Sequence, residues 1–134
     1  MMQKLELIKS GKLTAEENIK GFLDKIKKDN LKYNAVLTIN ENAINEAKKI
    51  DEKIKKKEKV GKLSGIGFII KSNICVKGLE TNCASKTLEG WKASYDATVI
   101  EKIKKEDGII LGMANMDEFA CGGSGETSAF GPTK

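Results

Sequence analysis

Two short apolar segments constrain the fold more than any other feature of the sequence. Residues 66–70 (Ile-Gly-Phe-Ile-Ile) and 109–111 (Ile-Ile-Leu) contain no polar side chain, which is typical of strands buried on both faces of a sheet. Between them, residues 96–108 carry apolar side chains at helical spacing, with Asp96 placed to cap the helix and Gly108 to end it in the left-handed conformation. Strand, helix and strand in this order predict a right-handed crossover and a partly parallel sheet, hence an α/β fold.

The first part of the chain is predicted to be mainly helical. Residues Thr14–Glu17 fit a capping box, and a helix is expected from there to about Lys28. Residues 35–39 predict a short strand. Asn40 is then expected to cap a second helix over residues 41–58, whose narrow apolar stripe indicates that it buries one side only.

Charge and glycine content divide the chain at Gly61. Residues 1–60 hold 15 lysines and 10 acidic residues, whereas residues 61–134 hold 9 of each and most of the glycines. We therefore predict a basic helical segment over 1–60 and the start of an α/β core over 61–134. The basic segment either binds tRNA or another polyanion or is simply a solvated, lysine-rich helix face.

The residue types that are absent exclude much chemistry. The sequence contains neither histidine nor arginine, so catalysis by Ser-His-Asp or Cys-His, His-ligated metals and arginine clamps are all excluded within this chain. The three cysteines have no CxxC spacing, which favours reduced thiols over a zinc site or a disulfide framework. No apolar run approaches ~18 residues and no leader segment is evident, so we predict a cytoplasmic location.

Several polar residues could carry chemistry. Lys71 directly follows the first apolar segment: it is either a strand-end lysine whose ammonium reaches water, or a dehydrated base that activates a hydroxyl nucleophile. Nothing marks Cys83 as an activated thiol, so ordinary packing is expected.

Asp117 and Glu118 are adjacent in the sequence, so their side chains diverge, and Asp117 is expected to cap a turn or hold a neighbouring loop. Residues 122–125 (Gly-Gly-Ser-Gly) fit neither a P-loop nor a nucleophile elbow; they form a flexible loop, or their amides face a substrate.

The end of the sequence predicts an incomplete domain. Residues 74–76 suggest a further short strand, and 115–134 a loop with one helical turn at 116–120. No closing element follows, so we expect a part of a longer domain, truncated at its C-terminal side. We also expect exposed strand edges around 66–70 and 109–111, and hence aggregation or dependence on a further C-terminal part.

From Gly61 onward the sequence resembles the amidase signature family. The matching segments are residues 63–66, 70–74 (Ile-Lys-Ser-Asn-Ile), 77–78, 83–89 (Cys-Ala-Ser-Lys-Thr-Leu-Glu), 95–99, 115–120 (Asn-Met-Asp-Glu-Phe-Ala) and 128–133. The resemblance implies the N-terminal part of an amidase-signature domain, with a mixed sheet between helices. Residues 1–60 resemble the helical start of such chains more loosely.

The resemblance also implies a mechanism and its residues. Members of the family use a Ser-cisSer-Lys triad, in which Lys71 would be the lysine and a serine attacks a carboxamide. Both serines would lie after residue 134, so Ser124 is not expected to be the nucleophile and residues 1–134 alone are expected to be inactive. The residues that would lie near the acyl pocket are Ala120, Cys121, Gly122 and Gly123.

Within the family, the sequence is most similar to the A subunits of glutamyl-tRNA(Gln) amidotransferases. That similarity implies glutamine as the amide and ammonia transfer to a B subunit, which uses ATP and Mg²⁺ to convert Glu-tRNA(Gln) to Gln-tRNA(Gln). It further implies a small C subunit that ties the other two together, and no cofactor or metal on this chain. Departures from the family pattern include Ser72 in place of Asp, Asp107 in place of Ala, and Cys121 to Gly123 in place of Met-Gly-Ser.

Two other functions remain open. One is a stand-alone amidase that acts on a small amide. The other is a non-catalytic basic module that binds RNA or a partner subunit through residues 1–60. The departures from the family pattern fit either a relaxed copy or part of an active subunit.

Overall fold

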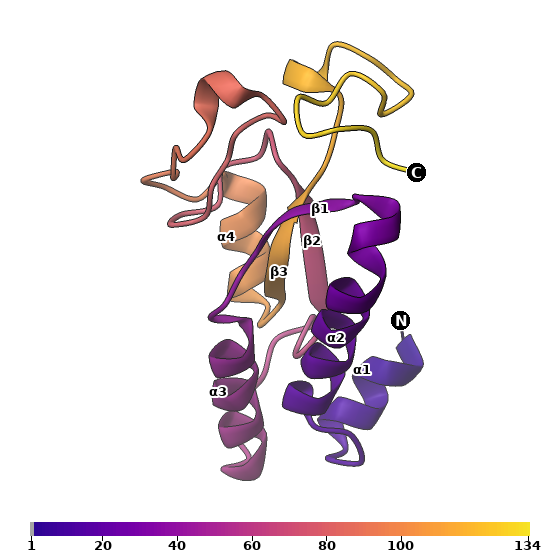
Figure 1. Ribbon diagram of the computed structural model, residues 1–134. Coiled ribbons are helices and arrows are strands. Elements are labelled where there is room, and N and C mark those ends of the chain that lie inside the picture. The colour runs from indigo at the N-terminus through magenta and orange to yellow at the C-terminus, as the bar shows by residue number, and fades with distance from the viewer. Residues whose placement is uncertain (1) are drawn as a thin grey trace.

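A three-stranded sheet with helices on both faces forms the centre of the molecule (Figure 1). The structure, a computed structural model, describes residues 2–134. The helices are α1 (Met2–Lys9), α2 (Ala15–Tyr33), α3 (Ala43–Lys55) and α4 (Thr98–Lys105), and the strands are β1 (Val36–Ile39), β2 (Gly67–Lys71) and β3 (Ile109–Ala114). Two single turns of 3-10 helix cover Lys86–Leu88 and Glu118–Ala120.

The sheet is mixed, as predicted. Its strand order is β1-β3-β2, and β3 pairs parallel with β2 and antiparallel with β1. Helix α4 lies between β2 and β3 in the sequence and packs on one face of the sheet (Figure 1). The predicted strand-helix-strand unit and its parallel pairing are therefore confirmed.

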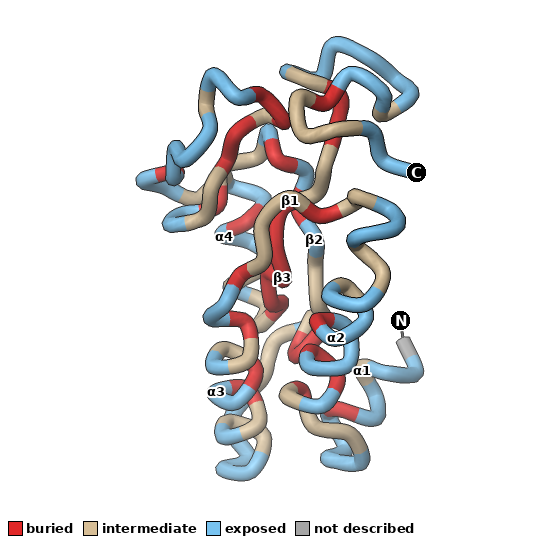
Figure 2. Tube along the Cα trace, in the orientation of Figure 1, coloured by how far each residue is buried: buried red, intermediate tan, exposed pale blue. Residues whose placement is uncertain are grey.

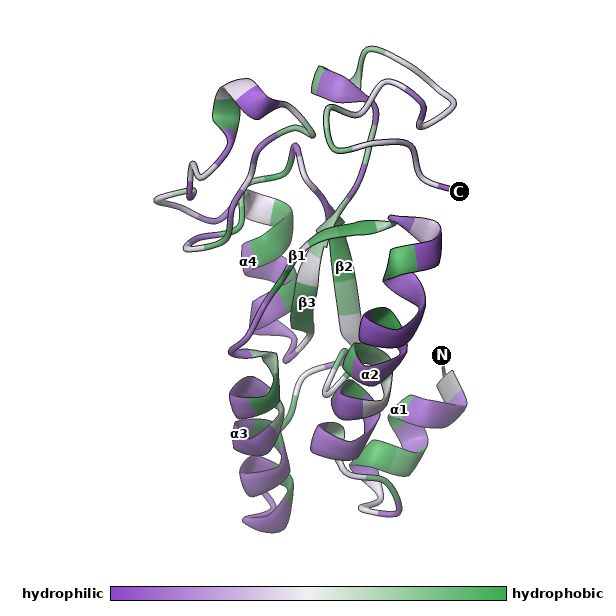
Figure 3. Ribbon diagram, in the orientation of Figure 1, coloured by the Kyte–Doolittle hydropathy of each residue, from purple (hydrophilic) through white to green (hydrophobic). Residues whose placement is uncertain are grey.

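Two apolar cores lie on opposite faces of the sheet. Ile109 and Leu111 pack with α1, α2 and α3, whereas Ile110 and Met113 pack with α4. Side chains alternate along β3, but an irregularity in its pairing with β2 between Ile110 and Gly112 shifts this alternation and places Met113 on the face of Ile110. The buried stretches follow β3 and the inner sides of the helices (Figure 2), and the green apolar stripes of the helices face inward (Figure 3). Residues 2–60 thus share a core with β3. No helix within residues 2–134 has the length and hydropathy required to cross a membrane.

Helix α2 begins at the predicted capping box and is longer than predicted. Glu17 N donates to Thr14 Oγ1 (3.0 Å), and Thr14 N donates to Glu17 Oε2 (3.0 Å). The helix continues to Tyr33, beyond the expected end near residue 28, because no glycine or proline interrupts residues 29–33. Asn34 ends it in the left-handed conformation (φ 51°), which asparagine adopts more readily than most residues.

Helix α3 is shorter than predicted, and Asn40 does not cap it. The helix begins at Ala43, with Asn42 at the N-cap position, and ends at Lys55. The Asn40 side chain instead accepts a hydrogen bond from Asn42 N (3.1 Å) and donates one to Ile110 O (2.8 Å). Asn40 therefore joins the start of α3 to the central strand, a role that needs a partner distant in sequence.

Both predicted end signals of α4 are wrong by one residue. Ala97, not Asp96, occupies the N-cap position, and Asp107, not Gly108, has the left-handed conformation (φ 59°). Asp96 accepts hydrogen bonds from Lys104 Nζ (2.7 Å) and Lys77 N (2.8 Å) instead. Burial opposes ionisation of this carboxyl, but the hydrogen bonds and the positive charge of Lys104 outweigh it and lower the pKa of Asp96.

Strand β2 is an edge strand and is not buried on both faces as predicted. The Ile70 side chain is buried, whereas Ile69 is 43% exposed and Lys71 is exposed. The expectation of an exposed edge at residues 66–70 is confirmed. The same expectation of an exposed edge is wrong for residues 109–111, because β3 is the central strand and is buried. Residues 74–76 form no strand.

Replacement of Asp107 by alanine is expected to destabilise the protein by about 1–3 kcal/mol. The Asp107 carboxylate accepts hydrogen bonds from Lys53 Nζ (2.8 Å) and Gly61 N (2.7 Å), so it ties α3 and the segment before β2 to the turn before β3. Alanine removes both bonds and is disfavoured at positive φ. Denaturant unfolding of the purified gene product measures the loss.

The matched control for this prediction is Asp107→Asn. Asparagine tolerates the left-handed conformation and keeps one oxygen that can accept from Gly61 N, so it loses chiefly the ion pair to the half-exposed Lys53, worth under about 1 kcal/mol. Equal losses for the two variants would show that the backbone conformation and the Gly61 contact contribute little.

Candidate active site

Lys71 is the last residue of β2 and lies opposite Ala114, the last residue of β3. Because the two strands are parallel, the chain leaves both of them at the same edge of the sheet. The loops that follow, residues 72–97 and 115–134, lie together beyond this edge (Figure 1). Residues after strand ends of a parallel sheet meet there, which is where open α/β sheets commonly bind ligands.

The Lys71 side chain is exposed, which agrees with the first of its two alternatives, a strand-end lysine whose ammonium reaches water. It shares the face of β2 on which Ile69 lies, and no segment of residues 2–134 covers this face at the end of the strand. Within the described part of the chain, Lys71 Nζ has no hydrogen-bond or ion-pair partner. Within residues 2–134, β2 has a neighbouring strand on one side only, which leaves this strand end open to solvent.

Ser72 follows Lys71 but faces the other side of the sheet. Its side chain is fully buried, and its Oγ has no hydrogen-bond partner among the described residues. Its backbone extends the pairing of β2 with β3, since Ser72 N donates to Ala114 O (3.2 Å). At this position, where the resemblance implies an aspartate, the chain therefore has a buried hydroxyl on the face of the sheet opposite the Lys71 side chain.

The dipeptide Cys83-Ala84 links the Lys71 strand end to the glycine-rich loop. Both residues have positive φ (52° each), a conformation uncommon for residues other than glycine. Cys83 N donates to Ser72 O (3.0 Å), and the two carbonyls accept from the loop, Cys83 O from Phe119 N (3.0 Å) and Ala84 O from Ala129 N (3.0 Å). Three segments distant in sequence are thereby joined through backbone hydrogen bonds.

The Cys83 thiol itself has no sign of activation. Burial raises its pKa, and the nearby Cys75 thiol raises it further. A thiol with a raised pKa stays protonated near neutral pH and is a poor nucleophile. The expectation of ordinary packing for Cys83 is therefore supported, and Cys75, Cys83 and Cys121 are all free thiols.

Asp117 holds the loop that follows it, one of the two roles predicted for it. Its carboxylate accepts hydrogen bonds from Gly125 N (2.9 Å), Thr127 N (3.1 Å) and Thr127 Oγ1 (2.9 Å). These bonds stabilise the ionised form and lower the pKa of Asp117. Residues 120–123, the predicted pocket segment, lie on this loop and are exposed. Residues 121–127 are neither strand nor helix, which agrees with the rejection of a nucleophile elbow.

Sequence reasoning missed two asparagines that hold the final loop. Asn34 Nδ2 donates to the carbonyls of Phe130 and Gly131 (3.0 Å each), and Asn115 Nδ2 donates to Asn34 O and Gly131 O (2.9 Å each). The position of Asn34 directly after a helix was a usable signal, because asparagine often adopts the left-handed conformation there. The partners of both side chains depend on tertiary structure.

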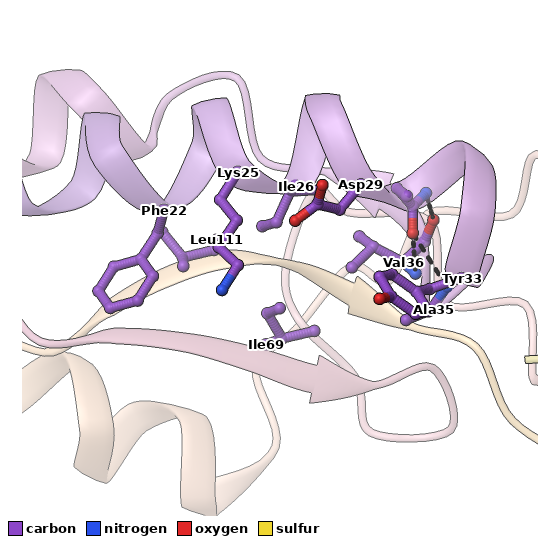
Figure 4. Close-up of a pocket in the computed structure, with 10 residues that line it drawn as sticks. Phe22, Lys25, Ile26, Asp29, Tyr33, Ala35, Val36, Ile69 and Leu111 are labelled. Atoms are coloured by element: carbon purple, nitrogen blue, oxygen red, sulfur yellow. Dashed lines mark hydrogen bonds between the residues drawn. The ribbon is translucent and has the colours of Figure 1, made fainter. Parts of the chain in front are cut away.

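An apolar groove runs between α2 and β2 on the face that also carries Lys71 (Figure 4). The residues that line it are Phe22, Lys25, Ile26, Asp29, Asn30, Tyr33, Ala35, Val36, Ile69 and Leu111. None of the predicted site residues is among them. The groove is therefore separate from the candidate active site, which comprises Lys71, the Cys83-Ala84 link and the loop 120–127.

Comparison with known proteins identifies the family of the chain. Residues 17–134 match the family described as Amidase, which is most of the chain. The chain belongs to the amidase family. The amidase motifs recognised in the sequence account for Lys71, the Cys83 segment and the Asp117 loop, the three parts that the fold joins.

Two similar sequences are named as A subunits of glutamyl-tRNA(Gln) amidotransferases. The chain is 51% identical over 133 residues to the A subunit of the glutamyl-tRNA(Gln) amidotransferase of Methanothermobacter thermautotrophicus, covering 98% of this chain and 29% of that protein. It is 54% identical over 121 residues to the protein of that name from Methanocaldococcus jannaschii, covering 88% of this chain and 27% of that protein. The chain thus spans less than a third of the length of these relatives.

Solved amidase-family structures share the fold. A chain from a vestigial protein complex linked to the origins of an s-triazine catabolic enzyme superposes with a TM-score of 0.95 at 30% identity, covering 99% of this chain and 30% of that one. A peptide amidase from Stenotrophomonas maltophilia gives 0.88 at 23% identity, covering 96% and 28%. The predicted class, part of an amidase-signature domain with a mixed sheet between helices, is confirmed.

Proposed function

We propose that this chain forms the part of a glutamyl-tRNA(Gln) amidotransferase A subunit that carries the catalytic lysine, Lys71. The observation that supports the proposal most is the 51% identity, over 133 residues, to a relative of that name. Solved structures described as amidases are less similar, at 23–33% identity. In this proposal the reaction of the whole protein is hydrolysis of the glutamine side-chain amide.

The proposed chemistry uses Lys71 as a base. In its neutral form the Lys71 amine accepts a proton through a bridging serine from the nucleophilic serine, whose oxygen attacks the amide carbon. Backbone amides stabilise the negative charge that develops on the carbonyl oxygen. The C–N bond then breaks, the nitrogen takes up the proton and leaves as ammonia, and water hydrolyses the acyl-enzyme to glutamate. Both serines are proposed to lie outside residues 1–134.

Lys71 needs a less hydrated setting than the one it has here. A neutral lysine near physiological pH requires burial or a positive neighbour. We propose that the remainder of the amidase domain covers the open face at the end of β2 and supplies this setting, together with the two serines. Residues 1–134 alone then have no amidase activity.

The proposed partners are those that the resemblance to these A subunits implies. Ammonia passes to a B subunit, which binds ATP and Mg²⁺ and uses them to activate the glutamate of Glu-tRNA(Gln), and a C subunit ties the other two together. The steps assigned to this chain need no cofactor, and their substrate is glutamine. We propose the cytoplasm, where aminoacyl-tRNA is used, as the location.

The experiment that tests the proposal is co-expression of the complete gene product with its partner subunits. We expect a stable complex that hydrolyses glutamine and converts Glu-tRNA(Gln) to Gln-tRNA(Gln). Hydrolysis of small amides by a protein that binds no partner would favour the stand-alone amidase instead. Salt-dependent tRNA binding without hydrolysis would favour the non-catalytic basic module.

A further inference from the structure

We propose that Asp117 is a positioning residue, which fixes the loop 120–127 relative to Lys71 so that its backbone can bind the substrate amide. The proposal rests on the proposed function and deepens it, because it assigns a role to a side chain that bonds to the loop backbone and not to Lys71. Three observations carry it, and each concerns a different part of the site.

The first observation is the number of contacts that Asp117 makes within the loop. One carboxylate oxygen accepts from Gly125 N (2.9 Å), and the other accepts from both Thr127 N (3.1 Å) and Thr127 Oγ1 (2.9 Å). The Asp117 residue is 7% exposed, whereas the loop it holds is mostly exposed. Residues 122–127 of the loop contain no strand or helix, and besides these three bonds they have one from Thr133 N to Gly125 O (3.2 Å) and one from Ser124 Oγ to Glu126 Oε2 (2.7 Å). Asp117 therefore makes a large part of the contacts that hold the loop.

The second observation is the contact between Asp117 and the predicted pocket segment. A Cβ atom at Gly122 would lie 2.5 Å from Asp117 Cγ, closer than real Cβ contacts allow. The backbone of Gly122 therefore packs directly against the carboxylate group. Movement of Asp117 would displace this part of the pocket segment.

The third observation connects the loop to Lys71. Phe119, directly before the loop, donates from its amide to Cys83 O, and Ala129, two residues after the loop, donates to Ala84 O (3.0 Å each). Cys83 N in turn donates to Ser72 O (3.0 Å). The ends of the loop are thus tied to the residue that follows Lys71. The bonds of Asp117 to Gly125 and Thr127 hold the loop between these ends, so the position of the loop backbone relative to the end of β2 depends on Asp117.

The test variant is Asp117→Asn in the complete protein, assembled with its partners. Asparagine presents an NH₂ group where one carboxylate oxygen accepted a hydrogen bond, so at least one loop amide loses its acceptor. We expect the KM for glutamine to rise about tenfold or more with kcat changed less than about threefold, because uniform binding is lost. We also expect faster hydrogen exchange at the amides of Gly125 and Thr127.

The matched control is Glu118→Gln, which neutralises the adjacent carboxylate. The Glu118 side chain makes no hydrogen bond within residues 2–134. The KM for glutamine and the amide exchange rates of the Glu118→Gln protein are therefore expected to match those of the wild type. Amidation driven by added ammonia bypasses glutamine hydrolysis and should be equal in all three proteins, which shows that the complex is intact.

The outcomes separate the two proposals. Unchanged exchange at Gly125 and Thr127 in Asp117→Asn, or an unchanged KM despite faster exchange, would overturn the role of Asp117 alone. A kcat that falls with no change in KM would also overturn it, since substrate binding would then not depend on the loop. Absence of glutamine hydrolysis in the wild-type complex would overturn the proposed function itself.

Discussion

The complex that carries Lys71→Met is expected to lose glutamine-dependent activity by at least about a thousandfold, because removal of a proton-transfer group from a triad disables the nucleophile. Methionine keeps much of the length and apolar stem of lysine but has no group that can accept the proton. Lys71 makes no hydrogen bond or ion pair within residues 2–134, so the substitution removes no contact that holds this part of the fold together. Release of glutamate from glutamine under saturating conditions measures the loss.

Two controls make this result specific. Lys86→Met removes another exposed lysine from the loops beyond the same sheet edge and should leave glutamine hydrolysis unchanged. Amidation of Glu-tRNA(Gln) with added ammonia should survive in Lys71→Met, since the B subunit performs that step in the proposed scheme. Retention of more than about a tenth of wild-type glutamine hydrolysis in Lys71→Met would show that Lys71 is not the base.

Replacement of Ile110 by alanine is expected to lower the free energy of unfolding by about 2–5 kcal/mol. Ile110 lies on the central strand, is 1% exposed and packs with Ile70, Val76, Ile100 and Met113. Its truncation leaves a cavity between the sheet and α4, where secondary structure on both sides limits collapse. Denaturant unfolding of the complete gene product, monitored by circular dichroism, measures the change.

Ile69→Ala is the matched control for that prediction. Ile69 is a neighbouring strand residue of the same type, but 43% of it is exposed on the open side of β2. The same truncation should cost less than about 1.5 kcal/mol at such a position, because less apolar surface is lost from the core. Equal losses for Ile69 and Ile110 would mean that the complete protein covers both faces of β2 to the same extent.

The elements that the sequence predicted well are those whose signal is local. The capping box at Thr14 and Glu17 and the apolar run of β3 were read correctly, because their residues interact with near neighbours or lie in a buried strand. Helix ends were less predictable. Asn40 and Asp96 looked like caps, but each bonds to a partner distant in sequence, Ile110 for Asn40 and Lys77 for Asp96.

The candidate site also contains some features with a local sequence signal and others that depend on long-range contacts. Lys71 could be found from its motif, and the loop-holding role of Asp117 was one of two roles predicted for it. The Cys83-Ala84 link could not be predicted. It consists of backbone hydrogen bonds made by two residues with positive φ, and neither residue is of a type that indicates this conformation. The unpaired hydroxyl of Ser72 was likewise invisible, since the serine gives no indication of its burial.

The sequence by itself determined the class of fold, the family and the identity of the one lysine proposed for catalysis, because hydrophobic periodicity and motifs are properties of neighbouring residues. Tertiary structure alone decided that Lys71 stands exposed on an edge strand and that Ser72 faces the other side. It also decided that Cys83 and Ala84 join the strand end to the Asp117 loop. The exposure of a side chain and its long-range hydrogen bonds depend on which segments lie next to each other in the folded chain. That arrangement is determined by the packing of the whole chain and not by neighbouring residues in the sequence.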